Sequence, residues 1–131
     1  MSKKGIFVKF SGLLIPQVQD VKVTASVSKN GQPSIKTSFQ KRNGGYVYQI
    51  QLLSPSSEVL MNKTLITRRT MVIKGPQKPM EYVFENDERM PNVLKNGSSY
   101  FVEVFEMMGL SKGPVTRKLV YLRKICFKRF R

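Results

Sequence analysis

Residues 94–104 restrict the possible fold more than any other stretch of the chain. The Asn-Gly pair at 96–97 favours a turn, because both residue types tolerate a positive backbone φ angle. A strictly alternating run follows, and it places Tyr100, Val102 and Val104 on one face of an extended strand. The stretch therefore predicts a turn that leads directly into a half-buried β-strand.

Alternation of apolar and polar residues continues through most of the chain. It indicates strands at three further places: 21–28, 35–40 and 46–53. Shorter strands are expected at 5–10, 58–61 and 81–85. Because no convincing long amphipathic helix accompanies these strands, the chain is predicted to be all-β.

With Leu94 included, the first stretch reads Leu-x-x-Gly-Ser-x-Tyr-x-Val-x-Val and resembles the E–F corner and F strand of a fibronectin type III domain. The resemblance implies a two-sheet antiparallel β-sandwich, Ig-like in type, of roughly seven to nine strands. It also implies that Tyr100 is buried and that its hydroxyl bonds back across the corner, with Leu94 and Gly97 as structural residues. Residues 107–114 are similar to the F–G loop of that family, and residues from 115 onward to its strand G.

The resemblance assigns residues 35–40 to strand B, where the family usually carries a core tryptophan. This chain has no tryptophan, and Phe39 takes that place. A chain of 131 residues is long enough to bury a core as one domain. We expect a single sandwich domain over 1–131, with an N-terminal extension strand at about 1–16 and a basic strand and tail at 115–131.

The formal net charge is +15, from 23 Lys and Arg residues against 8 Asp and Glu residues. The excess is uneven, since residues 81–110 carry −4 whereas residues 111–131 contain eight basic residues and no acidic one. So large a charge on a small domain implies an acidic or polyanionic partner. The candidate partner-binding residues are the basic ones of three stretches: Lys41, Arg42, Arg68, Arg69, Arg117, Lys118, Arg123, Lys124, Lys128, Arg129 and Arg131.

The C-terminal run that starts at residue 115 has two interpretations. As a strand, it directs Leu119 and Tyr121 toward the core. Val120 and Leu122 then lie on the opposite, mixed basic and apolar face, where we expect an interface. As a helix, it would stack Leu119, Leu122 and Cys126 at helical spacing. The β-branched and aromatic content of the run favours the strand.

The composition argues against an enzyme. The chain has no histidine, which removes the commonest general base and the usual transition-metal ligand. A single cysteine, Cys126, cannot complete a zinc site within one chain. We therefore expect no catalytic residues, no metal, no cofactor and no small-molecule substrate. The lone cysteine and the absence of a signal-peptide core predict an intracellular protein, cytoplasmic or nuclear.

Three functions remain open. The resemblance implies an interaction or assembly module that engages an acidic protein or nucleic acid, and a free edge on strand G suits a protein partner or self-association. The first alternative is a nucleic-acid binding protein, because Lys and Arg bind the phosphate backbone without sequence selectivity. The further alternative is a viral structural or matrix-like protein, or one that attaches to an anionic membrane.

Overall fold

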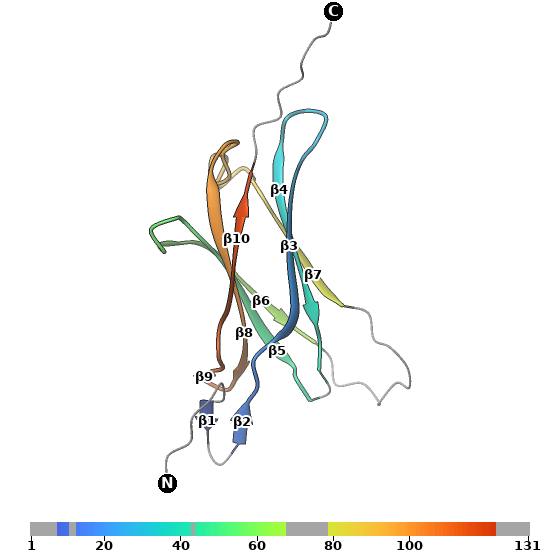
Figure 1. Cartoon of the computed structure of the whole chain (residues 1–131), viewed down its shortest axis with the longest axis vertical. Coiled ribbons are helices and arrows are strands. Elements are labelled where there is room, and N and C mark those ends of the chain that lie inside the picture. The colour runs from blue at the N-terminus through green and yellow to red at the C-terminus, as the bar shows by residue number, and fades with distance from the viewer. Residues whose placement is uncertain (1–7, 11–12, 43, 68–78, 123–131) are drawn as a thin grey trace, which may run out of the picture.

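The computed structural model describes residues 8–10, 13–42, 44–67 and 79–122. All regular secondary structure in this part of the chain is β-strand, and the strands form two antiparallel sheets and a separate hairpin (Figure 1). The prediction of an all-β fold is therefore confirmed.

The larger sheet has the strand order β10-β8-β5-β6, and β9 pairs with β8 outside that order. Its strands are β5 (Val47–Leu53), β6 (Val59–Ile66), β8 (Ser99–Met108), β9 (Ser111–Lys112) and β10 (Thr116–Tyr121). Because β8 lies between β5 and β10, its residues set the register of both neighbours.

The smaller sheet has the order β3-β4-β7. Its strands are β3 (Gln19–Val27), β4 (Pro33–Gln40) and β7 (Met80–Glu85). Before them, β1 (Val8–Phe10) and β2 (Leu13–Ile15) pair with each other as a short hairpin. The chain then passes between the two sheets after β4, after β6 and after β7.

The core lies between the two sheets, which gives the molecule its β-sandwich character. The rings of Phe39 on β4 and Tyr48 on β5 meet across the core at 4.9 Å between centroids. Both sheets contribute further buried side chains to the same cluster: Val21, Ile35, Phe84, Ile50, Leu52, Tyr100, Val102, Val104 and Val120. Burying a large apolar side chain of this kind stabilises a fold by about 1.5–3 kcal/mol. Phe39 thus occupies a core position, where it was expected.

Tyr100 fixes the corner that leads into β8 and is only 4% exposed. Its hydroxyl donates to the Val93 carbonyl at 3.0 Å and accepts from the Lys95 N–H at 2.8 Å. Leu94 is buried beside it, and Gly97 has a φ of 89°, which glycine adopts without strain. Tyr100 therefore has the burial and the backward hydrogen bond that the resemblance implies.

Asn86 holds the same corner through a pair of side-chain hydrogen bonds. Its Nδ2 donates to the Leu94 carbonyl at 2.9 Å, and its Oδ1 accepts from the Leu94 N–H at 2.7 Å. The irregular segment between β7 and β8 is thus held at both Asn86 and Tyr100, although no strand includes it.

Two elements differ from the sequence prediction. The expected F–G loop at 107–114 is largely a tight hairpin, because β8 continues to Met108 and pairs with β9. Gly109 makes the turn possible with a φ of 60°. The edge strand expected at 58–61 extends to Ile66, because β5 offers it a partner along its whole length.

Candidate interaction surface

The structure exposes the face of β10 that the sequence analysis assigned to the core. Leu119 is 50% and Tyr121 is 60% exposed, whereas Val120 and Leu122 are buried. Val120 lies opposite Tyr100 of β8, and opposite residues of an antiparallel pair share a face of the sheet. The prediction of Val120 and Leu122 as interface residues is therefore wrong, since both belong to the core.

Backbone hydrogen bonds at the end of β10 hold this register. The Leu122 N–H donates to the Ser98 carbonyl at 2.8 Å, and the Gly97 N–H donates to the Leu122 carbonyl. Alternation within the run could not give this orientation, because both of its faces carry large apolar residues. Only the pairing with the corner before β8 distinguishes the two faces.

Leu119 is one end of an apolar row across the outer face of the larger sheet. It pairs with Phe101 of β8, and Phe101 pairs on its other side with Leu53 of β5. Leu53 in turn pairs with Val59 of β6. Leu53 is buried in the middle of this row, whereas Leu119 and Val59 are exposed at its ends. We call these four residues the apolar row, and Tyr121 lies beside it on the same face.

Arg117 lies against the apolar row with its charge already balanced. Its Nε and Nη2 donate to Glu103 Oε2 at 2.8 and 2.6 Å, and a further N–H donates to Ser57 Oγ at 3.1 Å. The guanidinium also lies over the Phe101 ring, 4.7 Å from its centroid. An arginine held in this way is a poor ligand for an external phosphate, because it would first have to leave Glu103.

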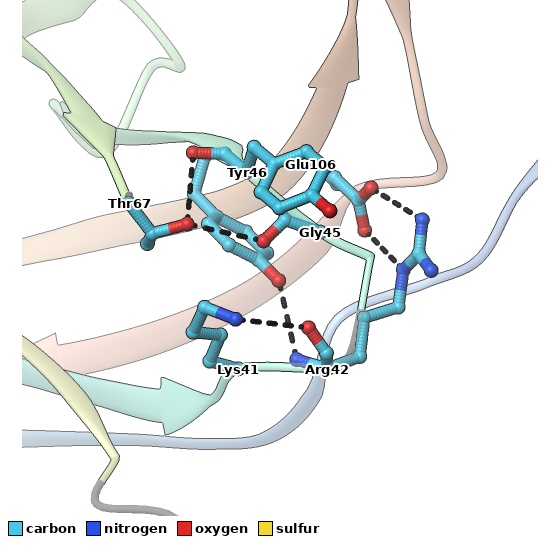
Figure 2. Close-up of polar contacts among 7 residues, drawn as sticks. Lys41, Arg42, Gly45, Tyr46, Thr67 and Glu106 are labelled. Carbon is cyan, nitrogen blue, oxygen red and sulfur yellow. Dashed lines mark hydrogen bonds and ion pairs between the residues drawn. The ribbon is translucent and has the colours of Figure 1, made fainter. Parts of the chain in front are cut away.

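Arg42 is paired as well, at the turn that follows β4. Its Nε and Nη2 donate to Glu106 Oε1 and Oε2 at 2.7 and 2.6 Å (Figure 2). Glu106 is only 2% exposed, so this bidentate pair lies partly inside the protein. The hydrogen bond to Glu106 raises the pKa of Arg42 above its ordinary value. The neighbouring Lys41 ammonium donates to the Arg42 carbonyl at 3.3 Å.

Tyr48 and Gly45 complete the surroundings of this ion pair. The Tyr48 hydroxyl accepts from the Arg42 backbone N–H at 3.3 Å, and burial raises the pKa of Tyr48. A side chain at Gly45 would collide with the Tyr48 hydroxyl, so glycine is needed there. Thr67 Oγ1 donates to the Gly45 carbonyl at 3.2 Å (Figure 2). The cluster links β8 to the turn between β4 and β5, so its role is to stabilise the fold.

The described residues do not gather the predicted basic residues into one patch. Glu103 and Glu106 lie on opposite faces of β8. Arg117 therefore pairs with Glu103 on the outer face, and Arg42 pairs with Glu106 on the inner face. Lys118 is exposed on β10. The other predicted basic residues lie outside the described ranges: Arg68, Arg69, Arg123, Lys124, Lys128, Arg129 and Arg131.

The charge divides unequally between the described residues and the rest of the chain. The described ranges contain 12 of the 23 basic residues and all 8 acidic ones, a net of +4. The remaining segments contain 11 basic residues and no acidic one. Most of the positive excess therefore belongs to segments outside the described strands.

No metal or membrane feature emerges from the described ranges. Nowhere in them do three or more His, Cys, Asp or Glu side chains come close enough to hold a metal ion. The same ranges contain no helix that is long and apolar enough to cross a membrane.

In comparisons with protein-family models and with curated proteins, no match to this chain was found.

Sequence reasoning missed both arginine–glutamate pairs. Arg42 and Glu106 are 64 residues apart in the chain, and Arg117 and Glu103 are 14 apart, so no local pattern connects them. The second pair follows from the register alone once Val120 is placed opposite Tyr100, because three residues back on β10 correspond to three residues forward on β8. Counting residues from the Val120–Tyr100 pair was therefore the signal from which the Arg117–Glu103 pair could have been predicted.

Proposed function

We propose that this chain is a non-catalytic interaction module, fibronectin type III-like in type, that docks an acidic protein partner on the outer face of its larger sheet. The observation that carries the proposal is the apolar row, which ends in the exposed Leu119 beside the exposed Tyr121. Exposed apolar residues that adjoin one another are typical of surfaces that bind other proteins, whereas scattered ones need no explanation.

Two observations support the fibronectin type III-like type. The strands that correspond to C, F and G are β5, β8 and β10, and they share one sheet. Those that correspond to B and E are β4 and β7, and they share the other, which is the division found in immunoglobulin-like sandwiches. The hydroxyl of Tyr100 also bonds back to the Val93 carbonyl, as in a tyrosine corner.

The charge supports an acidic partner. A net charge of +15 attracts acidic surfaces over long range and speeds their encounter with the protein. Specific docking then depends on contacts at the apolar row, since Arg117 and Arg42 are engaged by Glu103 and Glu106. Charge thus provides attraction, and the sheet face provides the contact.

A pull-down with and without nuclease tests this function. The informative variant is Leu119→Asp, and its matched control is Val83→Asp, which changes an exposed valine on the outer face of the smaller sheet. We expect nuclease-treated wild type and the Val83 variant to retain an acidic protein that the Leu119 variant loses. Retention of the same protein by all three would contradict docking on the apolar row.

One observation favours nucleic-acid binding as a second candidate. Tyr121 is 60% exposed at the end of β10, and basic residues follow in the sequence from Arg123 onward. Exposed aromatic rings beside Lys and Arg stack on unpaired bases, at about 1–3 kcal/mol per base. In that case nuclease removes everything the protein retains, and Tyr121→Ser weakens binding to polyuridylate whereas Leu119→Asp has a smaller effect.

A further inference from the structure

We propose that a second copy of this chain pairs antiparallel along the free edge of β3, through residues 23–27. The resulting dimer extends the smaller sheet across a twofold axis. This inference concerns another surface than the apolar row and does not depend on an acidic partner.

In the described ranges β3 pairs only with β4, so the backbone groups on its other edge have no strand partner among these residues. Its neighbour there is β10, the last strand of the larger sheet (Figure 1). Side-chain bonds tie the starts of the two strands: Gln17 Nε2 donates to the Val115 carbonyl and Thr116 Oγ1 to the Val18 carbonyl, both at 3.2 Å.

Further along, the two strands enclose a groove instead of joining. The groove has a volume of about 350 Å³. Residues 23–27 of β3 line one side of it, and Val120, Tyr121 and Leu122 line the other. An incoming strand can therefore approach the β3 edge in the half where no side-chain bond closes it.

The two halves of β3 differ in how well they are protected from pairing. Natural sheets protect edges with charged residues, proline or a bulge. The first half of β3 has two of these features. It carries the charged residues Asp20 and Lys22. Its pairing with β4 is irregular between Gln19 and Lys22, where Asp20 has a φ of 56°. Residues 23–27 have no charge, no proline and a regular register. Only this second half is suited to pairing.

The sequence of this half is self-complementary. It reads Val-Thr-Ala-Ser-Val, so two antiparallel copies centred on Ala25 place Val23 opposite Val27 and Thr24 opposite Ser26. Val23, Ala25 and Val27 are half-buried, whereas Thr24 and Ser26 are exposed. Apolar residues then meet on the inner face and hydroxyls on the outer one. Across such an axis residues of the same kind meet, valine with valine and hydroxyl with hydroxyl, and this self-match argues for a second copy.

The flanking residues are compatible with the same register. Lys22 falls opposite Ser28, and Lys29 opposite Val21, so no two charges of the same sign face each other. In a register that placed Lys22 opposite Lys22 of the second copy, or Lys29 opposite Lys29, two positive charges would face each other.

Introducing charges at two exposed positions tests the pairing. Thr24→Glu/Ser26→Glu places glutamates opposite each other on both sides of the axis, and we expect roughly tenfold weaker dimerisation. Thr24→Glu/Ser26→Lys is the matched control, because each glutamate then faces a lysine and the dimer persists. Position 24 lies opposite Lys36 of β4, so glutamate there is compatible with the fold.

Sedimentation equilibrium at about 0.15 M salt measures the dimer, because a Debye length of about 8 Å leaves charges on directly opposite residues only partly screened. The double glutamate variant lowers the net charge of +15 by two units, so any loss of dimer must come from the local contacts. A wild-type monomer at every concentration overturns the proposal, as does a dimer unaffected by the two glutamates. Loss of dimer in both folded variants overturns this register. We expect the double glutamate variant to retain the pull-down partner, because the apolar row is unchanged in it. The β3 proposal can therefore fail without the proposed function failing.

Discussion

At the scale of residues, the two arginine–glutamate pairs differ because only one carboxylate is buried. Arg42→Met leaves the Glu106 carboxylate inside the protein without its bidentate partner. We expect a loss of about 3 kcal/mol or more in the free energy of unfolding, measured by urea denaturation. Adding Glu106→Leu should recover most of it, because no buried charge then remains.

The matched control for this prediction is Arg117→Met. Its pair with Glu103 lies on the outer face, where 13% of the Glu103 side chain is exposed against 2% for Glu106, so water can reach the carboxylate that remains. We expect no more than about 1 kcal/mol. Equal losses in the Arg42 and Arg117 variants would contradict the role of burial.

Tyr48 makes stability sensitive to alkali. Burial raises its pKa in the folded protein, so the unfolded chain ionises first, near about pH 10. The stabilisation is complete below that pH and is lost as the pH rises through the pKa of the folded protein. Tyr48→Phe should flatten the fall of the unfolding free energy between about pH 9 and 11, and an equally steep fall in this variant would contradict the role of Tyr48.

Tyr100→Phe tests the corner before β8. The change removes the bond to the Val93 carbonyl and the acceptor of the Lys95 N–H, at 3.0 and 2.8 Å. We expect the fold to persist and the unfolding free energy to fall by about 1–2 kcal/mol, the value of one or two net hydrogen bonds. Tyr121→Phe serves as the control, and an equal loss in it would show that the corner bonds contribute nothing.

At the scale of elements, β10 combines a buried and an exposed face within six residues. Val120→Asp places a carboxylate in the core, and we expect a loss of several kcal/mol or failure to fold, seen in thermal melts by circular dichroism. Leu119→Asp, one residue earlier and half exposed, should change stability by no more than about 1 kcal/mol. Similar melting of both variants would contradict the register of β10 against β8.

β10 also shows where sequence reasoning reaches its limit. The strands with one polar face, such as β3 and β4, were predicted with nearly the right bounds, because alternation tells which side is buried. The burial of Tyr100 was predicted from the resemblance of residues 94–104 to the corner of a known sandwich family. The orientation of β10 was not, since Leu119 and Tyr121 are as apolar as Val120 and Leu122. Only the register with β8 decides between them, and register is a property of two strands.

At the scale of the whole molecule, charge should affect pairing along β3 and binding to a nucleic acid in opposite directions. Two copies with a net charge of +15 repel each other, so salt should strengthen pairing along β3. Binding to a polyanion releases counterions, so salt should weaken it. The contrast follows from charge alone and is independent of the residues in either contact.

The location of the charge leads to a final prediction. Lys118→Gln/Lys124→Gln/Lys128→Gln removes three charges from the C-terminal run, in which Lys118 is exposed on β10. If this run contacts phosphate, the log–log salt slope for duplex DNA should shrink by up to about 2.7, at roughly 0.9 per contact.

The control is a set of three exposed lysines elsewhere, each changed to glutamine: Lys22, Lys29 and Lys95. Both triple variants lower the net charge from +15 by three units, so they exert the same general attraction. A smaller slope in the first variant alone locates the phosphate contacts in the C-terminal run. Equal slopes in the two variants would contradict that location. The total charge would then account for the salt dependence of binding, and the position of the lysines in the chain would have no effect.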